Sequence, residues 1–346
     1  MEALWFWLLG GMLIVYVILD GFDLGAGALH LWLARTPTER RLVLRSIGPV
    51  WDGNEVWLVA AGGTLFFAFP GLYAAGFSGF YLPLMMVLWL LVLRGIAIEF
   101  RGHVDNAIWA PFWDVVFCGA SALLALFLGV ALGNVVRGAP LSAGGWFFEP
   151  LWTNFRVGPE PGILDWYTTT VGVAALAALA MHGAVWVWLK TGDALGERAR
   201  GAARVLSVVV FGLSLLVTAA TFRVQPLVAG HLADAPGGYV FAVVAVAGLV
   251  VVWLATGRRR MRLAFLGSTA YLAGILASAA FGLWPYVLPA TTGTAYGLTA
   301  HAVAAPDSSL RIGLAWWIPG MIIAGVYTVF IYRHFAGRVR LDGDGY

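Results

Sequence analysis

Charged side chains are scarce in this sequence. Asp, Glu, Lys and Arg make up only 11% of its 346 residues, whereas about a quarter of a soluble domain is charged. Hydrophobic residues make up 61%. This composition excludes an ordinary soluble domain and predicts an integral membrane protein. The formal net charge of +3 comes with basic residues in short loops between apolar runs, so it favours a membrane topology signal over nucleic-acid binding.

Cysteine is almost absent as well. The single Cys118 excludes an internal disulfide and a cysteine-based metal site, and its place in an apolar run predicts a small core residue. The N-terminus lacks the basic region of a secretory signal, so we expect the first apolar run to be retained. The sequence also lacks a metal-ligand cluster, a Gly-rich phosphate loop and a Ser-His-Asp arrangement.

Long apolar runs dominate what is present. About 20 apolar residues cross a bilayer as a helix. Nine stretches qualify: roughly 4–33, 49–70, 76–98, 113–136, 164–189, 202–222, 238–256, 262–284 and 309–334. The first is longer than one span requires, so we expect it to tilt or to project into the cytoplasm.

The basic residues fix the orientation of these spans. Of the 21 Lys and Arg residues, 17 lie on the side that follows the odd-numbered spans, including Arg333, Arg338 and Arg340 of the tail. The 4 on the other side are Arg137, Arg156, Arg223 and Arg311. Because basic loops stay in the cytoplasm, the N-terminus is predicted outside and the C-terminus inside.

The fold class that follows is an all-α integral membrane protein with about nine transmembrane helices, arranged as two four-helix groups plus one C-terminal helix. The first bundle covers 1–136 and holds the intramembrane carboxylates. An external loop rich in Gly and Pro covers 137–163, and the second bundle covers 164–284. An external loop, the last helix and a cytoplasmic tail cover 285–346.

Two acids lie deep in the first run. Tyr16, Asp20, Asp23, Gly27 and His30 follow one another at steps of four, three, four and three, which places them on one helix face. At 1.5 Å per residue, Asp23 would lie about 15 Å and Asp20 about 20 Å from the cytoplasmic end. Such a stripe suits a proton relay. The alternative is that the acids pair with an arginine of a neighbouring helix and hold the bundle together.

Two more acids open the second run. Asp52 and Glu55 follow Pro49 within the first turns, where the positive end of the helix dipole stabilises acids. They are candidates for the same proton route, and helix capping at the membrane interface is the alternative. Trp51 and Trp57 are expected to be interfacial belt aromatics.

Arg94, just inside the cytoplasmic end of the third run, is a candidate counter-ion for an acid on the first two helices; it could equally reach lipid phosphate. His103, Asp105 and Asp114 flank the next loop and are expected to be solvated or interfacial. The external acids form no recognisable pattern: Glu149, Glu160 and Asp165.

Six histidines call for a haem test. Only His30 and His182 lie within spans, and His30 is near an end. Met181 points to a different helix face from His182, so the two do not form a ligand pair. We therefore expect that this chain alone holds no haem.

Seven short motifs occur in order along the chain. They are 20–23 (DGFD), 38–41 (TERR), 47–57 (IGPVWDGNEVW), 77–81 (FSGFY), 94–101 (RGIAIEFR), 129–134 (GVALGN) and 284–289 (WPYVLP). In these motifs the sequence resembles subunit II of the cytochrome bd-type quinol oxidases. The resemblance spans nearly the full chain and is densest over the first 135 residues.

The resemblance implies a heterodimer in a bacterial or archaeal cell (inner) membrane. The partner would be a larger subunit I that carries two haem b groups and one haem d and oxidises quinol. The complex would reduce O2 to water with protons from the cytoplasm. This chain would bind no haem, support assembly of subunit I and contribute carboxylates to the proton route. In some members it also holds a structural quinone, and a small accessory subunit is a further partner the family allows.

Carried onto this sequence, the resemblance implies Asp23 and Asp52 as carboxylates of the proton route, with Asp20 alongside. Trp51 and Arg94 match positions near the quinone and the carboxylates. The full set of predicted residues combines these with the residue-based candidates. The proton pathway is Asp20, Asp23, Asp52, His30, Tyr16 and Glu55, and the quinone-proximal or counter-ion residues are Trp51, Arg94 and Glu99.

Two other functions compete with this hypothesis. A proton-coupled transporter could use Asp20 and Asp23 as its proton site, but such proteins typically show broken helices at the midplane in both halves. Here the intramembrane acids cluster in the first two spans. A purely structural membrane anchor would leave the mid-bilayer acids unexplained.

Overall fold

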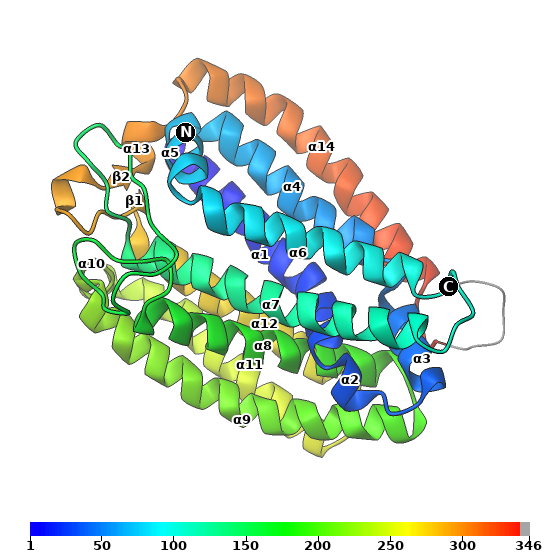
Figure 1. The fold of residues 1–346 in the computed structure, drawn as a ribbon. Helices are drawn as coiled ribbons and strands as arrows, with labels where there is room; N and C mark the ends of the chain where they lie inside the picture. The colour runs from blue at the N-terminus through cyan, green and yellow to red at the C-terminus, as the bar shows by residue number, and fades with distance from the viewer. Residues whose placement is uncertain (340–346) are drawn as a thin grey trace.

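The computed structural model describes residues 1–339, so Arg340 and the rest of the predicted tail lie outside the described residues. The chain forms a bundle of long helices that run along one common direction (Figure 1). The helices are α1 (Glu2–Ala28), α2 (His30–Leu33), α3 (Pro37–Ile47), α4 (Trp51–Ala68), α5 (Pro70–Gly79), α6 (Tyr81–Phe100), α7 (Trp109–Arg137), α8 (Trp166–Lys190), α9 (Asp193–Val224), α10 (Pro226–Asp234), α11 (Tyr239–Gly257), α12 (Met261–Leu283), α13 (Ala300–Val303) and α14 (Asp307–His334). Short elements complete the fold: strands β1 (Tyr286–Leu288) and β2 (Leu298–Thr299), and 3₁₀ turns η1 (Pro236–Gly238) and η2 (Thr294–Tyr296).

The all-helical membrane fold is confirmed. Among the described residues, eight single helices are long and apolar enough to cross a membrane: α1, α6, α7, α8, α9, α11, α12 and α14. The helices α4 and α5 pass the same test only as a pair, bent by 119° at their break, and the count is nine when this pair is taken as one span. The 18 residues of α4 alone extend about 27 Å, close to the thickness of the hydrocarbon core.

Three predicted spans differ from the structure by five residues or more at one end. The span predicted at 202–222 belongs to the longer helix α9, which begins at Asp193. The first helix ends at Ala28, and 30–33 form the separate helix α2. The last turn of α1 contains Gly25 and Gly27, and glycine weakens a helix by its backbone entropy. The third span begins at Tyr81 instead of 76, because 70–79 form α5. Pro70 is the first residue of α5, and proline lacks the N–H that a continuous helix would need there.

Helix α8 lies inside the bundle and packs against α1, α7, α9 and α12. Small residues allow the closest approach: a Cβ on Gly25 would meet the Leu179 carbonyl oxygen at 1.8 Å, so the α1 and α8 backbones touch. Phe22 of α1 stacks on Trp186 of α8 with ring centroids 3.9 Å apart. By contrast, α14 lies at the edge along α4, and Leu310 is its only buried residue. The division into two four-helix groups stays a prediction.

The two ends of the bundle differ in character. One end carries the N-terminus, the β1–β2 pair, α10, α13 and the long segment between α7 and α8; the other carries α2, α3 and the C-terminal part of the described chain (Figure 1). The termini therefore lie at opposite ends, as an odd number of spans requires. We refer to the first as the external end and the second as the cytoplasmic end, following the distribution of basic residues.

Candidate functional site

The carboxylates of α1 face the interior of the bundle. Asp20 and Asp23 are 0% and 1% exposed. Around them lie Arg94 of α6, Asn54 and Glu55 of α4, Tyr16 of α1 and Tyr332 of α14. We call these seven residues the carboxylate cluster. Four helices far apart in sequence thus meet at one polar site within an apolar bundle.

Arg94 is the only cation in the carboxylate cluster, and its guanidinium is fully buried. Its Nη2 lies 2.7 Å from Asp20 Oδ1 in an ion pair that lacks the angles of a hydrogen bond. The same nitrogen donates a hydrogen bond of 2.9 Å to Glu55 Oε2. Glu55 is the outermost member, with 23% of its side chain exposed. One guanidinium therefore faces three carboxyl groups, because Asp23 lies beside this pair.

Asp23 is bound by a neutral partner instead of a cation. Asn54 donates from Nδ2 to Asp23 Oδ2 at 2.8 Å and to the Leu19 carbonyl at 3.2 Å. The Tyr332 hydroxyl in turn donates to Asn54 Oδ1 at 2.9 Å. Asp23 Oδ1 and the Tyr16 hydroxyl are buried and have no hydrogen-bond partner among the described residues. Sequence reasoning did not place Tyr332 at the site, since no short-range pattern links α14 to α4, whereas Asn54 belongs to the 47–57 motif that pointed to this region.

The remaining predicted residues lie at the margin of the cluster or away from it. Asp52 is exposed in the first turn of α4. The Trp51 ring packs over Gly95, where an added Cβ would lie 3.4 Å from it, next to Arg94 in the chain. Glu99 is half-buried near the cytoplasmic end of α6. His30 does not continue the stripe of α1: it lies on α2 and binds a different acid.

That acid is Asp114, whose predicted solvated position is wrong: it is 1% exposed. Its carboxylate accepts from Arg101 Nε at 2.6 Å and from Arg40 Nη1 at 3.2 Å, and its Oδ1 lies 2.7 Å from His30 Nε2. These residues come from α2, α3, the end of α6 and α7. With two arginines and a histidine around one acid, this group ties together the cytoplasmic end of the bundle.

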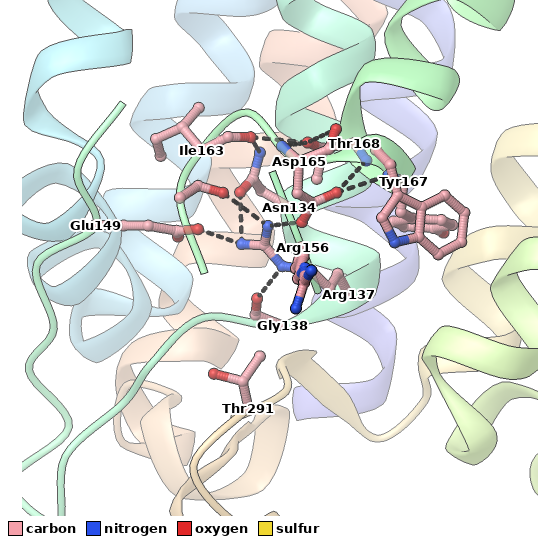
Figure 2. A network of polar contacts seen from close by, with 12 residues as sticks. Asn134, Arg137, Gly138, Glu149, Arg156, Ile163, Asp165, Tyr167, Thr168 and Thr291 are labelled. Carbon is pink, nitrogen blue, oxygen red and sulfur yellow. Dashed lines mark hydrogen bonds and ion pairs between the residues drawn. The ribbon is translucent and has the colours of Figure 1, made fainter. Parts of the chain in front are cut away.

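A third polar group lies at the external end, although sequence reasoning found no pattern among these acids (Figure 2). Arg137, the last residue of α7, is 2% exposed and forms ion pairs with Glu149 and with Asp165, the latter at 2.5 Å. Asn134 accepts from Arg137 Nη2 at 2.7 Å. Asp165 caps α8 in a capping box with Thr168, and that acid-to-threonine spacing was the one available sequence signal.

Glu149 is the most perturbed acid outside the spans. It is 1% exposed, and burial raises its pKa to about 7, with Asp165 adding to the rise and Arg137 opposing it. A carboxyl group with a pKa near neutrality exchanges protons in the range where cells work.

Two cavities lie at the cytoplasmic end. A larger one of about 360 Å³ is lined by Arg45, Lys190, His334 and Arg338 among others. A narrow slot of about 20 Å³ lies between α4 and α14, reaches Asn54 and Tyr332, and shares Pro49 and Val50 with the larger cavity. The slot has room for about one water molecule. It leads from the cytoplasmic end to the residue that binds Asp23.

The two histidines predicted within spans differ in their bonding: the buried His30 Nδ1 has no hydrogen-bond partner among the described residues, whereas His182 uses both ring nitrogens. His182 Nδ1 lies 2.7 Å from Ser268 Oγ and its Nε2 lies 2.9 Å from the Ile18 carbonyl, so both ring nitrogens are engaged. Across residues 1–339, no group of three or more His, Cys, Asp or Glu side chains is arranged to hold a metal ion.

Comparison with known proteins gives this arrangement a family. The family model described as cytochrome bd terminal oxidase subunit II matches residues 1–335. The chain belongs to the cytochrome bd oxidase subunit II family. As a subunit II, it is a multi-pass membrane component of a terminal oxidase complex that also contains a subunit I. This membership decides against the transporter.

Relatives of this subunit II family match over nearly their whole length. The chain is 30% identical to "Cytochrome bd-I ubiquinol oxidase subunit 2" of Escherichia coli K12, over 98% of this chain and 95% of the relative. It is also 30% identical to "Cytochrome bd ubiquinol oxidase subunit 2" of Bacillus subtilis, over 96% of each. A chain of the bd oxidase structure from Geobacillus thermodenitrificans superposes with a TM-score of 0.76 at 18% identity, covering 96% of this chain and 98% of that one, which shows a shared fold.

Proposed function

We propose that this chain is the haem-free subunit of a quinol-oxidising cytochrome bd complex. In this proposal it stabilises the haem-bearing subunit I and supplies a route for protons from the cytoplasm to the site of O2 reduction. The family membership and the relatives named as ubiquinol oxidase subunits support the complex. The single observation that carries the proton route is the gathering of two buried acids, Asp20 and Asp23, and the partly exposed Glu55 around one buried arginine.

The charges divide the roles within the carboxylate cluster. Asp20 lies against Arg94 and is the fixed anion of the pair. Asp23 has only the Asn54 amide as its partner, so its negative charge is not matched by a cation. An unpaired carboxylate in a buried site is costly, and a proton removes that cost. Asp23 is therefore the residue that accepts and passes on a proton.

The path to Asp23 begins at the cytoplasmic end. Glu55 is partly exposed, and Asp52 lies exposed one turn away at the start of α4, so both are placed to exchange protons with water. The slot beside Tyr332 and Asn54 offers a second approach to the same carboxyl group. We leave His30 out of this path, because its Nε2 lies 2.7 Å from Asp114, an acid outside the carboxylate cluster.

In the proposed complex, the two haem b groups and the haem d belong to subunit I, where they transfer electrons and reduce O2. The residues of this chain hold and move protons only. Consistent with this division, both ring nitrogens of His182 are hydrogen-bonded within the bundle, and His30 pairs with Asp114. The chain purified alone is expected to show no Soret band, and a Soret band from the pure chain would contradict this division.

The other predicted partners remain proposals. Quinol would be oxidised on subunit I. A structural quinone would lie near Trp51, Arg94 and Glu99, although the Arg94 guanidinium is already engaged by two carboxylates. Membrane lipid would cover exposed apolar faces such as that of α14 wherever subunit I does not. A small accessory subunit is a further proposed partner.

The test of the proton route is Asp23→Asn in the assembled complex. Because asparagine keeps the hydrogen-bonding shape but cannot carry a proton, O2 turnover should fall roughly 100-fold, the lower end of the range that general acid–base groups contribute. Unchanged visible spectra of the co-purified complex would show that it still assembles. Asp105→Asn, which changes an exposed acid of a cytoplasmic loop, is the matched control. Wild-type turnover in a fully assembled Asp23→Asn complex would contradict the proposal.

A further inference from the structure

The segment between α7 and α8, residues 138–165, is held at both ends by one side chain. Arg137 donates from Nε to the Gly138 carbonyl at 3.1 Å and from Nη1 to the Gly162 carbonyl at 3.0 Å. Its remaining donors reach Asn134, Glu149 and Asp165 (Figure 2). A guanidinium has five N–H donors, so each one is used. We call residues 138–165 the external loop of the structure.

Glu149 is the one member of this group whose bonding is incomplete. Its Oε1 accepts from Arg137, while its buried Oε2 has no hydrogen-bond partner among the described residues. Asp165 is fully engaged, since it accepts the backbone N–H groups of Tyr167 and Thr168 as well as Arg137. Asp165 already balances the charge of Arg137. An ionised Glu149 would leave one buried negative charge without a counter-ion.

We propose that Glu149 is a proton-binding site at the external end of the molecule, and that its bound proton fastens the external loop onto the ends of α7 and α8. This site is separate from the carboxylate cluster and does not depend on the proton route proposed above. When Glu149 loses its proton, the excess negative charge favours release of the loop around it.

The direction of the pH dependence follows from the groups that face Glu149. The charged ones are Arg137 at the end of α7 and Asp165 at the start of α8; Asn134 is neutral. Burial raises the pKa of Glu149 from its ordinary value of 4.5 to about 7. A group with a raised pKa in the closed state stabilises that state fully below its ordinary pKa, and the contribution is lost as pH rises through 7. The ratio of closed to open loop should therefore fall about 30-fold between pH 5.5 and pH 8.

Hydrogen exchange of the assembled complex measures the ratio of closed to open loop directly. The backbone amides between residues 143 and 161 are followed at pH 5.5 and pH 8, each normalised to an unstructured peptide of the same sequence. Protection of the wild-type loop should fall about 30-fold over this interval, while amides of α11 and α12 stay constant. In Glu149→Gln, which mimics the protonated acid, protection should stay at the wild-type pH 5.5 level throughout.

Glu160→Gln is the matched control, since Glu160 lies exposed in the same loop, and it should keep the wild-type profile. A wild-type loop whose protection does not change with pH would overturn the proposal, even if Glu149→Gln fails to assemble. The proposal is equally overturned if Glu149→Gln assembles and retains the wild-type fall.

Discussion

Arg94 and Arg137 are both buried arginines that face acids, but they bond in opposite ways. All five donors of Arg137 are used, and three of its contacts are to Gly138, Gly162 and Asn134 of the surrounding structure. Arg94 contacts only carboxylates, through Nη2, and its Nε and Nη1 have no hydrogen-bond partner among the described residues. The external group is saturated except at Glu149, whereas the carboxylate cluster is open at several atoms.

In the proposed account, this difference gives the external group a mainly structural role and the carboxylate cluster a role in proton transfer. A fully bonded network in a low-dielectric interior is rigid and costly to disturb. An incompletely bonded one leaves protons and partners free to exchange, which a proton route requires. The same residue types therefore indicate different roles, and the hydrogen bonds decide between them.

The largest expected effect is on stability, at Arg137 of the external group. Arg137→Leu removes five hydrogen bonds and leaves Asp165 and Glu149 facing each other without a cation. Breaking a buried charge pair in this way costs about 3–5 kcal/mol. We expect little assembled complex and a lower unfolding temperature, measured by co-purification and thermal denaturation. Arg156→Leu, an exposed change in the same loop, should be tolerated. Normal yield and stability of Arg137→Leu would contradict the structural role assigned to the Arg137 group.

An intermediate effect is expected at Arg94. Arg94→Gln leaves the carboxyls of Asp20, Asp23 and Glu55 without a cation, so assembly should decrease. Adding Asp20→Asn removes the acid that Arg94 balances and should recover much of the loss. A coupling of about 0.5–3 kcal/mol is expected for residues in direct contact. The stability of both single variants and the double variant gives this value, and strictly additive effects would show that the ion pair does not organise the cluster.

The smallest effect is expected at Asp52. Its exposed position in the first turn of α4 limits its contribution to the helix dipole, about 0.3–1 kcal/mol. Asp52→Asn should therefore leave turnover close to wild type, because Glu55 and the slot that reaches Asn54, the partner of Asp23, are unchanged. Turnover and thermal stability measured together check this. Complete loss of turnover would instead make Asp52 an obligatory step of the route.

Much of the fold could be predicted because lipid imposes simple rules. The length of the apolar runs predicted the spans. The placement of the arginines predicted an orientation that agrees with an odd number of crossings. The break at Leu29 and the short helix α5 after Pro70 escaped prediction, since both lie within apolar sequence where hydropathy does not change. The first depends on where the side chain of His30 binds, and the second on the missing N–H of Pro70.

The sites were predictable where their residues share a helix or where a cation inside a span calls for an acid. Arg94, predicted as a counter-ion for the first two helices, pairs with Asp20 and Glu55. Asp20 and Asp23 stand out because they interrupt an apolar run, and helix periodicity places them together. Asn54, Tyr332 and Asp114 acquire their roles from neighbours 31 to 278 residues away in the sequence. The buried position of Asp114 results from α2, α3 and the end of α6 converging on α7, which no local pattern encodes.

The central claim is that protons reach Asp23 from the cytoplasmic end. The most direct measurement is time-resolved proton uptake by the complex in lipid vesicles, with a pH indicator on the cytoplasmic face, as reduced enzyme reacts with O2. We predict that Asp23→Asn slows cytoplasmic proton uptake together with O2 reduction while the visible spectrum of the complex stays unchanged. Uptake at the wild-type rate and from the same face in Asp23→Asn would contradict the account.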